Sequence, residues 1–204
     1  MAVAEQAVPV PAAGLAQPER PAVPASIVPL AGIPFVTAIL VALVVSIQGN
    51  WSWALDFFHV VGGGLWTGVD LFMGFVIGPI MRKLSIPARI ELTTRLMPKM
   101  LLIMPTLVTM TLASGFQLAR LNGMLDTSYS RHAWVVVSMV VVAVMAITAL
   151  GLLQPANIAV LFELRKPQPD PAIIGGLMRR FVYASAVIGA MQIATLIIMT
   201  RLAS

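Results

Sequence analysis

Long apolar segments alternate with short polar connections along the 204-residue chain. A helix that crosses the hydrocarbon core of a bilayer needs about 20 predominantly apolar residues. Five segments meet this requirement, at about residues 27–47, 53–81, 100–121, 133–162 and 180–201. The pattern predicts an all-α, polytopic integral membrane protein, with about five transmembrane helices forming one bundle domain over residues 27–204.

Prolines subdivide this pattern. The second and fourth segments are longer than a bilayer requires, so they are expected to tilt, kink or project. Pro155 predicts a kink in the fourth segment, and Pro98 and Pro105 predict another near the start of the third. Asp170 followed by Pro171 is typical of a helix start, with a side-chain cap and a proline at the first helical position.

Residues 1–26 differ from the rest of the chain. They contain five prolines among small residues and show no helical periodicity. We interpret them as a flexible, Pro/Ala-rich tail, either a solvated leader or a strap that docks onto a partner subunit.

Composition and charge agree with a membrane protein. The chain is 59% hydrophobic and 10% charged, against about 25% charged residues in soluble domains. It has no cysteine, which excludes disulfides, thiolate metal sites and iron–sulfur clusters. The net charge of +5 comes from basic residues beside apolar segments, so it indicates topology rather than nucleic-acid binding. Basic connections at 82–99 and 163–179 predict an inner-membrane protein with its N-terminus in the cytoplasm and its C-terminus outside.

One polar stripe interrupts the second apolar segment. At about 100° per residue, Asp56, His59, Gly63, Trp66 and Asp70 share one face of the predicted helix. Ionisable groups in a bilayer are costly, so they usually face the bundle interior and mark a pathway or a ligand. The stripe is therefore the predicted functional region.

The two histidines are expected near the outer membrane face. His59 follows the start of the second segment, and His132 opens the fourth. Imidazoles from two helices could ligate a b-type haem, with Asp56 accepting the second N–H of His59. A site with His59 as the single ligand is equally open. A proton relay or a structural role for His59 and a plain interfacial role for His132 are the alternatives.

Arg120 and Arg131 flank the outer connection, where positive charge is not expected. Arginine pairs with carboxylates in a forked geometry, so these residues are candidate partners for haem propionates. The alternative is that both side chains extend from helix ends to the interface.

Asp70 lies 11 residues from His59, roughly 16 Å along a helix, which is too far for direct contact. It is expected to be protonated, paired across the bundle, or part of a proton or cation path. Three threonines and a glutamine of the third segment are the expected hydrogen-bond partners, namely Thr106, Thr109, Thr111 and Gln117.

Small and sulfur-containing residues suggest two further features. Gly64 and Gly68 are spaced as in close helix–helix packing on the face opposite the stripe. Met97, Met100 and Met104 have thioether groups suited to Cu(I), although methionine in a membrane helix usually serves packing.

The stripe also carries a short motif, His59-x-x-Gly62-Gly63-x-x-Trp66-x-Gly68 followed by Leu71-Phe72. It resembles a pattern in the copper-resistance protein D-like membrane domain, the membrane-type protoporphyrinogen oxidase and the cytochrome-like membrane domain of bacterial urate oxidases. The resemblance covers about 15 residues and implies a helical bundle with His59 as an interior ligand of b-type haem or copper. The Pro-Arg pair and second histidine of the protoporphyrinogen oxidase type are not found, so that activity is not predicted.

These observations favour a b-haem-binding membrane subunit in electron transfer, working with a quinone, a periplasmic redox partner or other membrane subunits. A copper or proton transporter or accessory protein, using His59 and Asp70, is one alternative. A cofactor-free structural subunit of a larger complex is another. The sequence contains no phosphate-binding loop, zinc-protease motif or serine nucleophile motif, so whether the chain is an enzyme stays open.

Overall fold

The computed structural model describes residues 28–166, 168 and 170–203, and no strand occurs within them. A short 3-10 turn (Leu30–Gly32) and two π-helical segments, η2 (Met73–Ile77) and η3 (Ala149–Leu153), join the α-helices. The α-helices are α1 (Ile33–Gln48), α2 (Ser52–Phe72), α3 (Gly78–Lys83), α4 (Ile86–Leu121), α5 (His132–Thr148), α6 (Gln154–Leu164) and α7 (Pro171–Ala203). The all-α prediction is confirmed, and the predicted tail at 1–26 lies outside the described residues.

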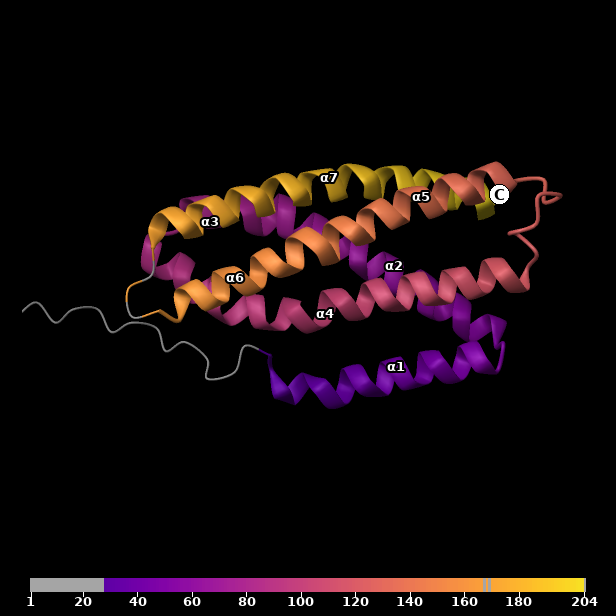
Figure 1. Ribbon diagram of the computed structural model, residues 1–204, viewed down its shortest axis with the longest axis horizontal. Coiled ribbons are helices and arrows are strands. Elements are labelled where there is room, and N and C mark those ends of the chain that lie inside the picture. The colour runs from indigo at the N-terminus through magenta and orange to yellow at the C-terminus, as the bar shows by residue number, and fades with distance from the viewer. Residues whose placement is uncertain (1–27, 167, 169, 204) are drawn as a thin grey trace, which may run out of the picture.

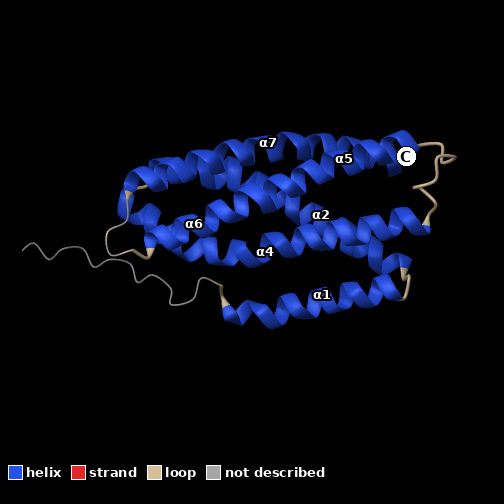
Figure 2. Ribbon diagram, in the orientation of Figure 1, coloured by secondary structure: helices blue, strands red, loops and turns tan. Residues whose placement is uncertain are grey.

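The helices form an elongated bundle (Figures 1 and 2). Helix α4 packs against α2, helix α5 packs against α7, and α1 lies at the edge against α4 and α2. In Figure 1, α2 crosses behind the other helices, so its two ends approach different neighbours. The described chain begins at one end of the bundle and ends at the opposite end.

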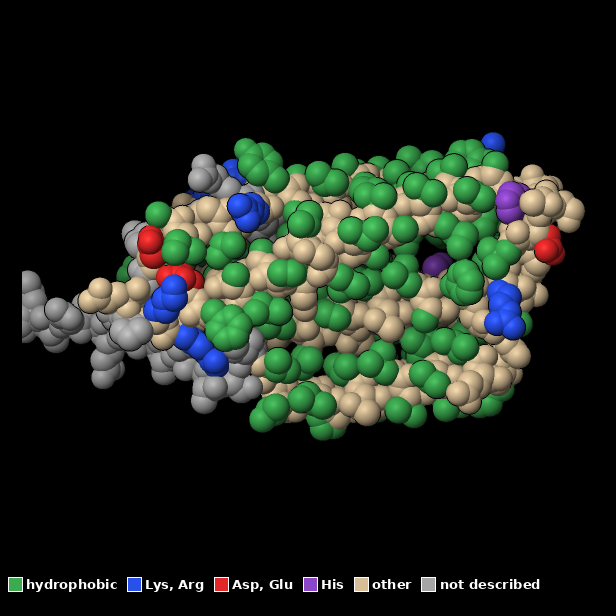
Figure 3. Space-filling model, in the orientation of Figure 1, with side chains coloured by type: hydrophobic (Ala, Val, Ile, Leu, Met, Phe, Trp, Pro, Cys, Tyr) green, Lys and Arg blue, Asp and Glu red, His purple; other side chains and the backbone are tan. Residues whose placement is uncertain are grey.

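Five helical stretches are long and apolar enough to cross a membrane, at Leu30–Gln48, Ser52–Lys83, Pro87–Leu121, His132–Leu164 and Tyr183–Ala203. Large apolar side chains are exposed along them, such as Phe35 at 71% and Ile147 at 70%. Figure 3 shows hydrophobic side chains along the length of the bundle, with charged side chains gathered at its two ends. This distribution fits contact with lipid, in agreement with the five predicted spans.

The second and fourth spans are broken in the same way. In each, a five-residue π-helical segment is followed two residues later by a proline, Pro79 after η2 and Pro155 after η3. A proline lacks its N–H and its ring crowds the carbonyl four residues earlier, and a π-helical turn relieves this crowding. A π-helical segment thus precedes Pro155, where a kink was predicted, and a matching segment precedes Pro79, for which the sequence analysis made no prediction.

The third span begins earlier than predicted, because one continuous helix runs from Ile86 to Leu121 through Pro98 and Pro105. Pro105 cannot donate a hydrogen bond to the carbonyl of Leu101. The side-chain Nε2 of Gln154, from α6, donates to this oxygen at 3.1 Å. A side chain from a neighbouring helix thus replaces the missing backbone donor.

The helix that contains the fifth span also begins earlier than predicted, because α7 starts at Pro171 rather than near residue 180. The side chain of Asp170 accepts a hydrogen bond from the backbone N–H of Ala172 at 2.8 Å, which confirms the predicted cap. The buried carboxylate of Glu163 holds this loop, because it accepts bonds from Lys166 Nζ at 2.6 Å and from the Asp170 N–H at 3.1 Å.

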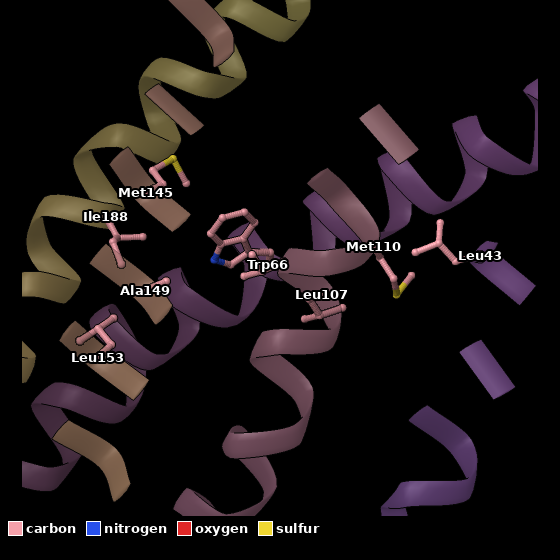
Figure 4. Packing of buried hydrophobic residues seen from close by; sticks show 9 residues of the cluster. Leu43, Trp66, Leu107, Met110, Met145, Ala149, Leu153 and Ile188 are labelled. Atoms are coloured by element: carbon pink, nitrogen blue, oxygen red, sulfur yellow. The ribbon is translucent and has the colours of Figure 1, made fainter. Parts of the chain in front are cut away.

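The core lies where α2, α4, α5 and α7 meet. Trp66, 3% exposed, occupies its centre together with Leu107, Val108, Met145 and Ile188. Figure 4 shows the indole between side chains of the neighbouring helices. The core therefore surrounds the middle of the polar stripe on α2.

Candidate functional site

His59 projects from α2 toward α4. Its Nδ1 lies 2.9 Å from the backbone carbonyl oxygen of Thr111. The ring also packs on the α-carbon of Gly115, where a Cβ would lie 2.5 Å from His59 Cε1. The imidazole is therefore fixed between a main-chain acceptor and a position that only glycine can occupy.

Glycines on α2 bring the two backbones together. A Cβ on Gly62 would lie 2.8 Å from Thr111 Oγ1, and one on Gly63 would lie 3.4 Å from Thr111 Cγ2. The hydroxyls of Thr111 and Ser114 donate to carbonyls of their own helix, at Leu107 and Met110. Polar groups at this contact are thus satisfied within α4, and α2 can approach without burying an unpaired hydroxyl.

The contact with Thr111 determines the histidine tautomer. A carbonyl oxygen only accepts hydrogen bonds, so Nδ1 must donate and neutral His59 carries its proton there. Nε2 then keeps the lone pair that binds a metal ion. Among the residues described, no group of three or more His, Cys, Asp or Glu side chains could hold a metal ion.

Asp56 does not occupy the place expected for it. Its side chain is exposed, and the Thr111 carbonyl takes the role of acceptor for the histidine N–H. The expectation was wrong because Asp56 shares a helix face with His59, whereas the ring turns toward the neighbouring helix α4. The helical pattern shows which residues share a face of α2, but the packing of α2 against α4 determines the hydrogen-bond partner of His59.

The other residues expected around this site lie at the same end of the bundle. His132 begins α5, and its buried Nδ1 has no hydrogen-bond partner within the described part of the chain. Arg131 donates from Nη1 to the carbonyl of Leu202 at 3.1 Å, near the end of α7. Arg120 is exposed in the last turn of α4. Arg131 is thus hydrogen-bonded to the C-terminal end of α7, whereas the side chain of Arg120 is exposed at the surface.

Asp70 forms a second polar site at the other end of α2. It is half-buried, and its Oδ2 accepts a hydrogen bond from Gln192 Nε2 on α7 at 2.7 Å. The nearby indole Nε1 of Trp66 is buried and has no hydrogen-bond partner in the described structure. Gln192 is 1% exposed, and its Oε1 has no partner in the described structure.

Gln192 was missed in the sequence, where threonines and Gln117 on the third segment were the expected partners of Asp70. Thr106 and Thr111 donate to carbonyls of their own helix, and Gln117 donates to the Asn50 side chain at 2.6 Å. A lone glutamine in the apolar fifth segment was the available signal, because an uncharged amide in a span also needs a partner.

The structure also bears on two further predictions, helix packing through Gly64 and Gly68 and copper binding by the methionines. A Cβ added at Gly64 or Gly68 would have no atom within 4 Å, so these glycines do not mediate helix packing within the described part of the chain. The close approach uses Gly62 and Gly63 on the adjacent face instead. Met97 is part of one buried cluster with Leu101 and Leu161, whereas Met104 packs against the central core, so the two thioethers serve separate packing contacts.

Comparison of the chain with family models, curated proteins and solved structures gives no match in any of the three. The resemblance of the His59 motif to known membrane families therefore stays a prediction.

Proposed function

We propose that the protein is a b-type haem-binding subunit of the inner membrane that works in electron transfer, with His59 as an axial ligand. The observation that carries this proposal is the 2.9 Å contact between His59 Nδ1 and the Thr111 carbonyl. A histidine that ligates a metal usually donates its other N–H to such an acceptor, which fixes the ring and raises its basicity. His59 has such an acceptor in the carbonyl of Thr111.

The surrounding residues fit a haem at this end of the bundle. His132 supplies a buried imidazole nitrogen without a partner in the described structure, so it is the candidate for a second axial position. Arg120 is exposed at the same end and is the candidate partner of a propionate, whereas Arg131 is already bound to Leu202. Haem would supply an iron that takes up and releases one electron, and the protein would supply ligation, burial and orientation.

The charge distribution favours a cytoplasmic position for the opposite end. Basic residues with described side chains gather toward that end, at Arg82, Lys83, Arg89, Arg95, Lys99, Arg165, Lys166 and Arg180. Arg120, Arg131 and Arg201 lie toward the histidine end. By the positive-inside rule, the histidine site would face the periplasm, within reach of a periplasmic redox partner or a quinone in the bilayer.

A specific observation also favours a second function, proton or cation movement through Asp70. Its carboxylate binds a glutamine with a buried, unpartnered oxygen, which is an expensive arrangement for a purely structural contact. Copper binding has weaker support, because two of the three methionines in question pack in separate clusters.

Absorption spectroscopy of the detergent-purified full chain, expressed with haem supplied, tests the leading proposal. We expect a Soret band and a haem content near one per chain, both lost in His59→Ala. His132→Ala is the matched variant: a retained band with altered ligand-field features indicates a second axial ligand, and an unchanged spectrum indicates His59 as the single ligand. A colourless wild-type protein would overturn the proposal. Metal analysis of that sample would then test copper, and co-purifying subunits would test a cofactor-free structural role.

A further inference from the structure

A groove of about 650 Å³ opens between the broken fourth span and α7. One wall comes from Gly151 in η3 and from Pro155 and Ala159 in α6, and the other comes from Ala184 and Val187 in α7. Small side chains line most of this surface. The groove lies where the π-helical segment and Pro155 interrupt the regular helix, so it follows from the same break that shapes the fourth span.

The groove has a cationic rim. Arg180 and Tyr183 line it one turn apart on α7, and both are exposed, Tyr183 to 73%. Within the described part of the chain, Arg180 forms no ion pair with a carboxylate. An apolar trough therefore ends at an available guanidinium group and a phenol hydroxyl.

The depth of the groove residues in the bilayer also bears on which ligand the groove fits. In the sequence, the apolar part of α7 follows directly after Arg180 and contains no charged residue before Arg201. Arg180 therefore lies at the level of the lipid headgroups, while Tyr183 lies about 4.5 Å deeper along the helix and Val187 roughly 10 Å deeper, toward the acyl chains. The polar and apolar parts of the groove match the two parts of a phospholipid.

We propose that this groove binds one phospholipid with an anionic headgroup. An acyl chain fills the space between Gly151 and Val187, and the headgroup phosphate pairs with Arg180 and accepts a hydrogen bond from Tyr183. Guanidinium groups match the geometry of phosphate oxygens, and basic pockets between transmembrane helices recognise anionic headgroups. The inference is independent of haem at His59, because the groove lies on other helices.

Filling the groove tests the acyl-chain half. A Cβ on Gly151 would meet no atom within 4 Å, so Gly151→Leu introduces a side chain into the groove without a clash at its base. Gly64→Leu on α2 is the matched control, because Gly64 also has open space and does not line the groove. After exhaustive detergent exchange, we expect about one phospholipid per chain in the wild type and in Gly64→Leu, and several-fold less in Gly151→Leu.

Charge removal tests the headgroup half. In nanodiscs containing phosphatidylglycerol and phosphatidylcholine, Arg180→Gln should lower the preference of retained lipid for phosphatidylglycerol about fivefold. Arg82→Gln is the control, because Arg82 is exposed toward the same end and does not line the groove. Arg180→Lys should keep most of the preference.

Three results would overturn the proposal: equal retention in Gly151→Leu and the wild type, equal preference in Arg180→Gln and the wild type, or displacement of the lipid by millimolar inorganic phosphate. The first two would indicate only annular lipid, and the third would indicate a phosphate site. Circular dichroism and size-exclusion profiles of each variant would establish that loss of lipid does not come from unfolding.

Discussion

The two polar sites on α2 show how differently one helix face can be used. His59 meets the backbone of α4 through a glycine contact, and its Nδ1 has a partner at 2.9 Å. Asp70 meets a side chain of α7, and two neighbouring buried polar atoms, Trp66 Nε1 and Gln192 Oε1, lack regular partners in the described structure. At the first site, one ring nitrogen of His59 has its hydrogen-bond partner and the ring is held in place. At the second site, buried polar atoms can still form hydrogen bonds.

The difference arises because α2 crosses the bundle obliquely and changes neighbours along its length (Figure 1). A group that is held by a main-chain carbonyl keeps its orientation whatever the side chains around it, as a metal ligand requires. A carboxylate held by one amide can exchange partners, as a proton or cation site requires. The positions of the two sites thus support different roles for them.

The largest expected loss of stability comes from a substitution at the α2–α4 contact, which holds His59 and not Asp70. Gly115→Ala would place a Cβ 2.5 Å from the His59 ring, in a contact where both helix backbones are already close. We expect destabilisation of up to about 3 kcal/mol from overpacking, together with loss of the Soret band that the proposed haem would give. Gly64→Ala, with open space around it, should be neutral or stabilise by up to about 1 kcal/mol. Unfolding in detergent titrated with sodium dodecyl sulfate measures both, and equal stability of the two variants would contradict the contact.

An intermediate effect is expected at the α2–α7 contact. Gln192→Leu removes the donor to Asp70 and leaves a half-buried carboxylate unpaired, which should cost about 1–3 kcal/mol. Asp70→Leu combined with Gln192→Leu should regain most of that stability, because removing both partners leaves no unsatisfied group. A double-mutant cycle in the same unfolding assay measures the coupling, and additive losses would show that the two side chains do not interact. The Soret band that the proposed haem would give should persist in both variants.

The smallest expected effect concerns Asp56, which shares the helix face of both sites. Because its side chain is exposed and the histidine N–H is held by Thr111, Asp56→Ala should change stability by less than about 0.5 kcal/mol. The haem content and the Soret position should also stay unchanged. A loss of haem similar to that in His59→Ala would restore Asp56 as the residue that orients the ring.

The stripe was recognisable because its members repeat with the period of an α-helix, and its partners were not. The contribution of Thr111 is a main-chain carbonyl, which every residue carries and no residue type reveals. The need for glycine at position 115 likewise appears only when the ring of another helix is placed against it. Gln192 lies 122 residues from Asp70, and no periodicity within either segment connects them.

The glycines show the same limit within one helix. Gly64 and Gly68 have the spacing of a packing motif, yet they face outward, and Gly62 makes the tight contact instead. Spacing gives the angle between two residues on a helix, while the rotation of the helix toward its neighbours depends on all its contacts together. A helix face can therefore be predicted before the partner that covers it.

The sequence by itself determined the helical class, the five apolar spans, the break at Pro155 and the single face that holds His59 and Asp70. These properties follow from hydropathy, proline chemistry and the helical period, which act within a segment. Only the tertiary structure decided that His59 meets α4, that Asp70 meets α7, and that Gln154 compensates for Pro105. Such pairings depend on how separate helices cross, and local residue patterns carry no record of that geometry.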